Sequence, residues 1–194
     1  MKELKTVQPG EKFNYGGLDW EVIEQTKGRA LCLAVRSIGD KAFDTNNKND
    51  WKGSSLRKYL NGTFLKKLVK AGAKAAAFLP MELDLTSDDG LDDYGTSTDK
   101  IGLISCEQYR RFRRLVIPLR DWWRVITPWS TTANGYTADV RIVNPDGSLN
   151  YGYGGAASDT IGVRPLCTHL RGAGYAAEGP DLQLLCPRLA VSGL

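Results

Sequence analysis

The sequence contains a single histidine, His169, which excludes a metal site built on two or more imidazole ligands. It has no run of about eighteen apolar residues, so we expect no transmembrane helix. The start of the chain, Met1 to Thr6, lacks the apolar segment of a secretory signal. We therefore expect a protein that is cytoplasmic at synthesis, with later association with a virion or a cell surface left open. The net charge of +4 is too small to indicate a nucleic-acid partner.

Cysteine is sparse, with Cys32, Cys106, Cys167 and Cys186 as its only occurrences. No C-x-x-C pair is present, so neither a zinc ribbon nor a thioredoxin-type redox motif is indicated. Without an export signal, we expect reduced thiols, and a disulfide between Cys167 and Cys186 stays open for an oxidising environment. A catalytic cysteine would need a base, for which His169 is the only imidazole.

Motifs for metals and cofactors are also missing. The sequence has no P-loop and no G-x-S-x-G, and the Gly152-x-Gly154-Gly155 run is not followed by a helical pattern. Acidic residues that suggest calcium do not have the spacing of an EF-hand loop; they are Asp84, Asp88, Asp89, Asp92 and Asp93. We therefore expect no cofactor, no bound metal and no enzymatic activity.

The first third of the chain predicts a β-meander followed by helices. Aromatic and β-branched residues, separated by glycine turns, predict strands over Phe13–Tyr15, Leu18–Glu24 and Ala30–Ser37. A helix is predicted to begin at Ser54 or Ser55 and to end at Asn61-Gly62. An apolar stripe at helical spacing then predicts a second short helix; it comprises Phe64, Leu65, Leu68 and Val69.

The middle of the chain is acidic and then apolar. Ser87–Asp99 is predicted to be an exposed loop, and Ile101–Ile104 a short strand. Ser105 and Gln108 have the spacing of a capping box, which predicts a helix from Cys106 to about Arg114.

From Trp122 onward, the composition changes to small, uncharged residues and aromatics. Between Val125 and Val163, more than half of the residues are Gly, Ala, Ser, Thr or Asn, which disfavours a long helix. Strands are predicted over Ala138–Val143 and Ile161–Arg164, with a turn at Asn144–Gly147. Tyrosine among serine, glycine and asparagine is typical of antibody paratopes. An ordinary β edge whose tyrosines pack on the core is the alternative.

Several motifs occur in order between Phe13 and Leu166. They are Gly17-x-x-Trp20-x-Val22-Ile23, Trp51-x-x-Ser54-x-Leu56-Arg57-x-x-Leu60-Asn61-x-x-Phe64, Asp99-x-Ile101-x-Leu103-Ile104-Ser105-x-Glu107-x-Tyr109, Trp122-Trp123, Val143-x-x-x-Gly147 and Gly162-Val163-Arg164-Pro165. Their order and spacing resemble a family of uncharacterised domains from gut bacteria and their phages. Arg124–Pro128 departs from that pattern, which has Leu-Arg-Ser-Pro after the tryptophan pair.

The resemblance implies an α+β protein with a C-type-lectin-like fold, in which a small twisted antiparallel sheet with two flanking helices displays long ligand-binding loops. It divides a single domain, residues 1–194, into a scaffold (1–121), a loop-rich region (122–165) and a tail that it does not cover (166–194). It also implies kinship with the variable proteins of diversity-generating retroelements, in which mutagenesis at adenines rewrites the loops.

A ligand-binding display protein for a protein or glycan receptor is therefore the favoured function. The expected contacts are aromatic and polar side chains of the loop-rich region: Arg124, Ile126, Trp129, Thr131, Thr132, Asn134, Tyr136, Asn150, Tyr151, Tyr153, Ser158 and Asp159. The alternatives are a phage or cell-surface assembly module, with a phage structural partner or a homo-oligomer, and an enzyme of the formylglycine-generating type.

Other conspicuous side chains are expected to support the scaffold. Trp122 and Trp123 are expected to anchor the loop region to the core; the alternative is that one of them lines a ligand surface, because adjacent tryptophans in a strand point to opposite faces. Arg57 and Arg164 are expected to bind loop carbonyls. A basic cluster predicts either a solvated helix face or a surface for an anionic partner. It comprises Arg110, Arg111, Arg113, Arg114, Arg120 and Arg124.

Overall fold

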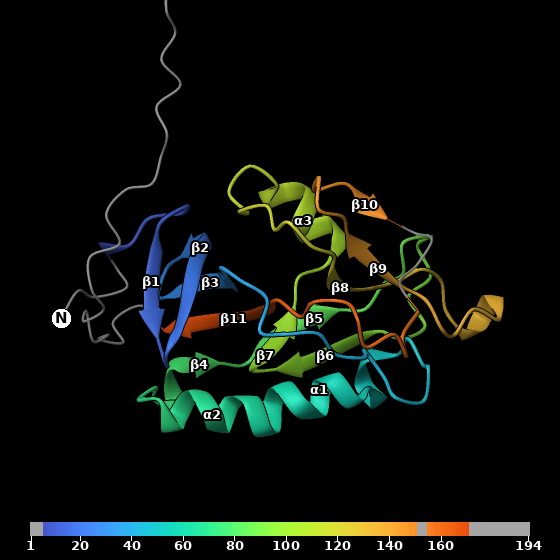
Figure 1. The fold of residues 1–194 in the computed structure, drawn as a ribbon, viewed down its shortest axis with the longest axis horizontal. Helices are drawn as coiled ribbons and strands as arrows, with labels where there is room; N and C mark the ends of the chain where they lie inside the picture. Colours follow the sequence, from blue (N-terminus) through green and yellow to red (C-terminus); the bar gives the residue numbers. More distant parts are fainter. Residues whose placement is uncertain (1–5, 151–154, 171–194) are drawn as a thin grey trace, which may run out of the picture.

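The computed structural model describes residues 6–150 and 155–170, and within them the chain is mixed α and β, with mostly strands and few helices (Figure 1). The paired strands are antiparallel. The α+β class predicted from the sequence is therefore confirmed. Tyr151, Tyr153 and Cys186 lie outside the described residues.

The largest sheet joins the two ends of the described chain. In sheet order its strands are β1 (Lys12–Tyr15), β2 (Leu18–Thr26), β3 (Arg29–Ala34), β11 (Pro165–Leu170) and β4 (Phe78–Leu79), with β7 (Ile101–Leu103) also paired to β11. The three predicted N-terminal strands are confirmed, the third ending at Ala34. Residues 166–170, which the family resemblance left uncovered, complete β11, which lies between strands from the first third and the middle of the chain.

Two smaller sheets complete the β-structure. One has the order β10 (Leu149–Asn150), β9 (Val140–Val143) and β8 (Trp123–Pro128), and the other pairs β5 (Met81–Asp84) with β6 (Thr96–Asp99). The predicted turn at Asn144–Gly147 is confirmed, because the Gly147 N–H donates to the Asn144 carbonyl at 2.8 Å.

The predicted strand over Ile161–Arg164 is wrong, because this segment makes only isolated bridges before β11 begins at Pro165. Gly162 bridges Asp40 and Trp123. Its N–H donates to the Trp122 carbonyl at 3.0 Å, and its own carbonyl accepts from the Arg124 N–H at 2.9 Å. The backbone here therefore binds the entry to β8 instead of extending a regular ladder.

Two consecutive helices lie beneath the strands, and a third lies near β8 and β9 (Figure 1). They are α1 (Ser55–Tyr59), α2 (Leu65–Lys70) and α3 (Cys106–Phe112), with short 3-10 turns at Trp51–Gly53, Ala75–Ala77 and Thr132–Asn134. Ser54 is the N-cap of α1 and accepts from the Arg57 N–H. The predicted capping box of Ser105 and Gln108 is confirmed at α3, although the helix ends at Phe112.

The predicted helix end at Asn61-Gly62 is wrong. A π-helical turn, Leu60–Phe64, carries the chain from α1 into α2 without a break. The Asn61 side chain instead binds the start of β7: its oxygen accepts from the Lys100 and Ile101 N–H groups at 3.1 and 3.0 Å, and its amide donates to the Ile101 carbonyl at 2.8 Å. These tertiary bonds replace the stop signal that the local sequence indicates.

Asp99 shows that the predicted acidic loop, Ser87–Asp99, is not exposed throughout. Its carboxylate is buried at the end of β6 and accepts from the Trp51 Nε1–H and the Arg57 Nε–H, both at 2.9 Å, and from the Ser97 hydroxyl at 2.8 Å. Three donors compensate the loss of hydration. Arg57 thus supports the scaffold, as predicted; it also donates to the Lys52 carbonyl.

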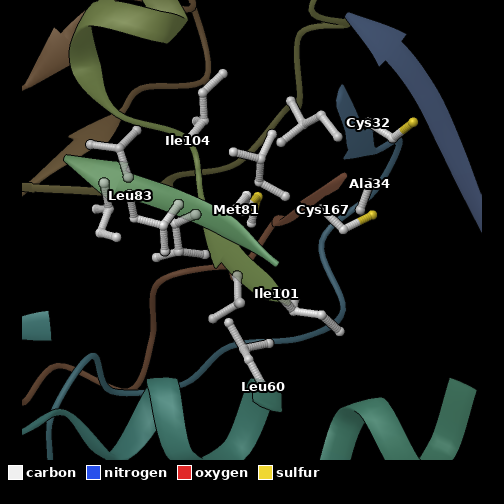
Figure 2. Packing of buried hydrophobic residues seen from close by; sticks show 14 of the residues in the cluster. Cys32, Ala34, Leu60, Met81, Leu83, Ile101, Ile104 and Cys167 are labelled. Atoms are coloured by element: carbon white, nitrogen blue, oxygen red, sulfur yellow. The ribbon is translucent and has the colours of Figure 1, made fainter. Parts of the chain in front are cut away.

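The hydrophobic core fills the space between the strands and the α1–α2 helices, where Leu60 points toward Ile101 (Figure 2). Cys32 and Cys167 are directly opposite each other on β3 and β11. Together with Cys106 they are free and buried, and burial raises the pKa of each of these thiols. Thiols with raised pKa values in an apolar interior are poor nucleophiles.

His169 is a buried, neutral side chain. Its ring lies 4.7 Å from that of Phe78, 5.1 Å from Tyr15 and 5.7 Å from Trp20, measured between centroids. Burial lowers the pKa of His169 to about 4, and its Nε2 is without a hydrogen-bond partner among the described residues. The single imidazole is therefore part of the core packing.

Replacement of His169 by phenylalanine is expected to change the pH dependence of stability. The folded pKa of about 4 lies below the unfolded value of 6.5, so the unfolded chain binds more protons between these two pH values. The contribution of His169 to the free energy of unfolding should therefore be constant above about pH 6.5 and decrease by on the order of 3 kcal/mol as the pH falls to about 4.

The His169→Phe variant should lack this part of the decrease, as measured by urea unfolding at a series of pH values. Equal pH profiles for the two proteins would contradict the assignment of a neutral, buried His169.

Candidate ligand-binding site

The loop between β8 and β9 is fixed by hydrogen bonds from Asn49, whose side chain is buried. The Asn49 amide donates to the carbonyls of Ser130 at 2.9 Å, Tyr136 at 3.3 Å and Asp139 at 3.1 Å. Its oxygen accepts from the Tyr94 hydroxyl at 2.8 Å. One side chain thus satisfies three loop carbonyls that have no ladder partner.

The acidic loop before β6 also binds this segment. Asp89 accepts from the Ser130 hydroxyl at 2.6 Å and from the Asn134 amide at 3.2 Å. The hydrogen bond from Ser130, followed by that from Ser87, holds the pKa of Asp89 below its usual value. Hydroxyl and amide groups of the protein therefore occupy the lone pairs that a cation would otherwise use.

Asp93 acts in the same way on the next two residues. Its carboxylate accepts from the Thr131 and Thr132 hydroxyls, the second at 3.2 Å. Within residues 6–150 and 155–170, no group of three or more metal-ligating side chains is placed to hold an ion. The acidic loop thus fixes the position of the neighbouring loop, which we call the 130–136 loop.

The predicted contact residues in and beside the 130–136 loop differ in their exposure to solvent. Thr131 is buried, so its assignment as a ligand contact is wrong; its hydroxyl caps the short helix Thr132–Asn134. Thr132 and Asn134 are exposed, and Tyr136 is 55% exposed, the highest value among the large apolar side chains described. Trp129 is half-buried, with the Arg141 guanidinium 5.3 Å from its ring centroid.

Arg124 and Ile126, two further predicted contacts, are corrected by the structure because both side chains are fully buried. They belong to β8, which is buried along its whole length. The Ile126 N–H donates to the Ile104 carbonyl at 2.9 Å, which places this part of β8 against another strand end. With 0% and 1% of their surfaces exposed, Arg124 and Ile126 are not on the surface of the loop region; an edge of Ile126 lines a separate pocket of about 220 Å³ beside Leu83 and Ser105.

The buried Arg124 guanidinium instead organises the segment that precedes β11. Its Nε donates to the Lys41 carbonyl at 3.1 Å, and its Nη2 donates to the carbonyls of Gly155, at 3.2 Å, and Ser158. Burial lowers the pKa of Arg124 to about 10, so the group stays charged at neutral pH. A charged donor thus fixes residues 155–158 from inside the protein.

A pocket of about 360 Å³ lies beside this fixed segment. It is lined by Trp122, Ile142, Asn150, Ser158, Thr160 and Ile161. Ser158 and Asn150 were predicted contacts, while Asp159 is exposed without being part of the described lining. We call this feature the Trp122 pocket.

Trp122 and Trp123 differ sharply in exposure, so only Trp123 anchors the core and the alternative, with one tryptophan at a surface, applies. Trp123 is 1% exposed and packs edge-on against Tyr109, whereas Trp122 is 49% exposed and lines the pocket. The Trp122 Nε1–H donates to the Asn144 side-chain oxygen at 3.0 Å, and the Asn150 amide donates to the same oxygen at 2.9 Å. One turn residue therefore orients two walls of the pocket.

The sequence did not identify Ile142, Thr160 and Ile161 as pocket residues. Thr160 carries a signal that was available, since it lies two residues after the predicted contact Ser158. The sequence predicts Ile142 and Ile161 to be core residues, because isoleucine in a strand-like segment is most often buried. Both are indeed largely buried and present only an edge to the pocket.

Three arginines of the basic cluster, on or directly after α3, have partners within the chain. Arg110 forms an ion pair with Asp88 at 3.1 Å, Arg111 pairs with Glu24, and Arg113 donates to the Asp146 carbonyl at 3.4 Å. This favours a solvated helix face over a surface for an anionic partner. Arg164 supports the scaffold, as predicted, through the Ala34 and Ile117 carbonyls.

Comparison with known proteins adds no functional assignment. No protein-family model, curated protein or solved structure matches this chain. Among the described residues, the helices are all too short or too polar to cross a membrane. The 130–136 loop and the Trp122 pocket therefore carry the functional argument.

Asn49→Ala should destabilise the protein by roughly 2–4 kcal/mol, because the Ser130 and Tyr136 carbonyls and the Tyr94 hydroxyl lose a hydrogen-bond partner, while the Asp139 carbonyl keeps the Trp129 N–H. The matched control is Asn46→Ala on the same polar loop, whose side chain is exposed and should cost less than about 0.5 kcal/mol. Urea unfolding measures both values. Equal stability of the two variants would show that Asn49 does not hold the 130–136 loop.

Proposed function

We propose that this chain is a ligand-binding display protein with a C-type-lectin-like fold. It binds a protein or glycan receptor through the 130–136 loop and the segment around the Trp122 pocket, by recognition without chemistry. We further propose that it is the variable protein of a diversity-generating retroelement. The sequence motifs between Phe13 and Leu166 support both parts of this proposal.

The observation that carries the proposal is the fixation of uncharged loops by buried polar groups. Asn49 and Arg124 are buried and bind loop carbonyls, while Asp89 and Asp93 bind loop hydroxyls. Loops that are ordered before binding lose less conformational entropy when a ligand arrives. Exposed aromatic residues, Tyr136 and Trp122, sit on this fixed framework, in keeping with a recognition surface.

The arrangement of strands and helices supports a C-type-lectin-like fold within the α+β class. The last described strand, β11, lies next to the N-terminal meander, and α1 and α2 flank the sheets (Figure 1). The 130–136 loop extends from the side of the molecule opposite to β1 (Figure 1). Thiol chemistry of the formylglycine-generating type is disfavoured for Cys32, Cys106 and Cys167 by their burial and raised pKa values.

The receptor-binding proposal predicts a specific loss of binding in Tyr136→Ala. Labelled full-length protein is applied to arrays of glycans and of bacterial surface proteins, and each captured species is then titrated. Tyr136→Ala should weaken binding by about tenfold or more, as expected for an exposed aromatic contact. Its thermal stability should match that of the original protein.

The control for this experiment is Val69→Ala, which changes a side chain that is 41% exposed on α2. Binding that is equally weak in both variants, or insensitive to Tyr136, would contradict the use of the 130–136 loop. A homo-oligomer with this loop buried would instead support an assembly module.

Diversification predicts where related copies of the gene differ. Substitutions should concentrate at adenine-containing codons for exposed positions such as Thr132, Asn134 and Tyr136. They should be rare at the buried Arg124 and Ile126, because a change there removes loop anchoring or core packing. Sequencing the 3′ half of the gene across isolates measures this, and an even scatter of substitutions would contradict diversification.

A further inference from the structure

The Trp122 pocket combines one aromatic wall with several hydroxyl and amide groups. Trp122 is nearly half exposed, although its neighbour Trp123 is buried, and its Nε1–H is already bonded to Asn144. The polar edge of the indole is thus satisfied, and its remaining accessible surface is the apolar ring. An aromatic ring held in this way offers a flat, rigid contact surface to a ligand.

The polar groups of the pocket can both donate and accept. The Ser158 and Thr160 hydroxyls share one hydrogen bond at 3.1 Å, which uses only one of their two protons. The Asn150 amide is oriented by Asn144. The Ser158 backbone is fixed by the buried Arg124, so its hydroxyl stands at a defined place.

The described lining carries no charged side chain. The Arg124 charge beneath it is directed at the Lys41, Gly155 and Ser158 carbonyls. A phosphorylated, sulfated or carboxylated ligand would find no ion-pair partner on the described lining. The aromatic and uncharged polar groups of the pocket therefore favour an uncharged ligand that has one apolar face and hydroxyl groups around its edge. A sugar ring has these properties.

We propose that the Trp122 pocket binds a neutral saccharide without a metal ion, the ring packing on Trp122 and the hydroxyl groups bonding to Ser158 and Thr160. The volume of about 360 Å³ lies within the range of small-ligand pockets. Metal-free binding follows from the absence, among the described residues, of any ligand set for a cation. This inference rests on the proposed recognition function and names the class of its ligand.

The test uses the full chain on an array of neutral oligosaccharides ending in glucose, galactose, mannose or N-acetylglucosamine, beside sialylated and sulfated ones. Binding is expected to neutral members only, and to persist in EDTA. The bound oligosaccharide is then titrated by calorimetry against the variants. Trp122→Ala and the double variant Ser158→Ala/Thr160→Ala should each lose about tenfold or more in affinity.

Trp122→Phe keeps an aromatic face and should recover part of the affinity lost in Trp122→Ala. Two controls, Thr63→Ala for loss of an exposed hydroxyl and Val69→Ala for loss of an exposed apolar group, should bind like the original protein. Thermal unfolding of each variant separates loss of binding from loss of folding.

Several outcomes would overturn the inference. They are binding of charged glycans only, loss of binding in EDTA, and affinity that does not respond to Trp122→Ala in a folded protein. If the protein binds a surface protein through Tyr136 and binds no glycan, the proposed function is supported and the proposal of a saccharide ligand is contradicted. If neither glycan nor protein binds, both proposals fail together.

Discussion

The buried guanidinium of Arg124 is the interaction on which the loop region depends. A charge in the interior is tolerated where hydrogen bonds replace most of its hydration, and here the carbonyls of Lys41, Gly155 and Ser158 accept from Nε and Nη2, while Nη1 has no partner among the described residues. Those carbonyls belong to segments far apart in the sequence and outside any regular sheet. The same bonds therefore stabilise the charge and fix the course of two irregular segments.

Arg164 and Asn49 are two further buried side chains that donate hydrogen bonds to backbone carbonyls. Arg164 is fully buried on the approach to β11 and donates to the carbonyls of Ala34 and Ile117, close to the buried Glu21. Asn49 does this with a neutral amide and three carbonyls. Long loops need such internal donors, because their own backbone groups have no ladder to pair with.

Local signals were enough to narrow the N-cap of α1 to Ser54 or Ser55 and to predict the capping box at Ser105 and the turn at Asn144, since the bonding partners lie within a few residues. Asn61 was misassigned as a helix stop because its partners, Lys100 and Ile101, are about forty residues away.

The assignment of Arg124 and Ile126 as contact residues failed for the same reason. Arg124 and Ile126 belong to an uncharged, loop-like composition, yet β8 is covered on both faces by segments that no local pattern connects to it. The tryptophan pair as a whole could be singled out, because neighbouring strand residues face opposite ways and one of the two can reach a surface. Which of the two faces outward depends on long-range packing and could not be predicted.

Asn144 joins two properties of the molecule that are usually separate. Its backbone carbonyl closes the turn between β9 and β10, and its side-chain oxygen receives both Trp122 and Asn150. The conformation of this turn therefore also sets the positions of Trp122 and Asn150 in the Trp122 pocket. A change in hairpin length at this point would reset the spacing of the cavity walls while leaving the large sheet intact, so evolution can adjust ligand size here independently of the fold.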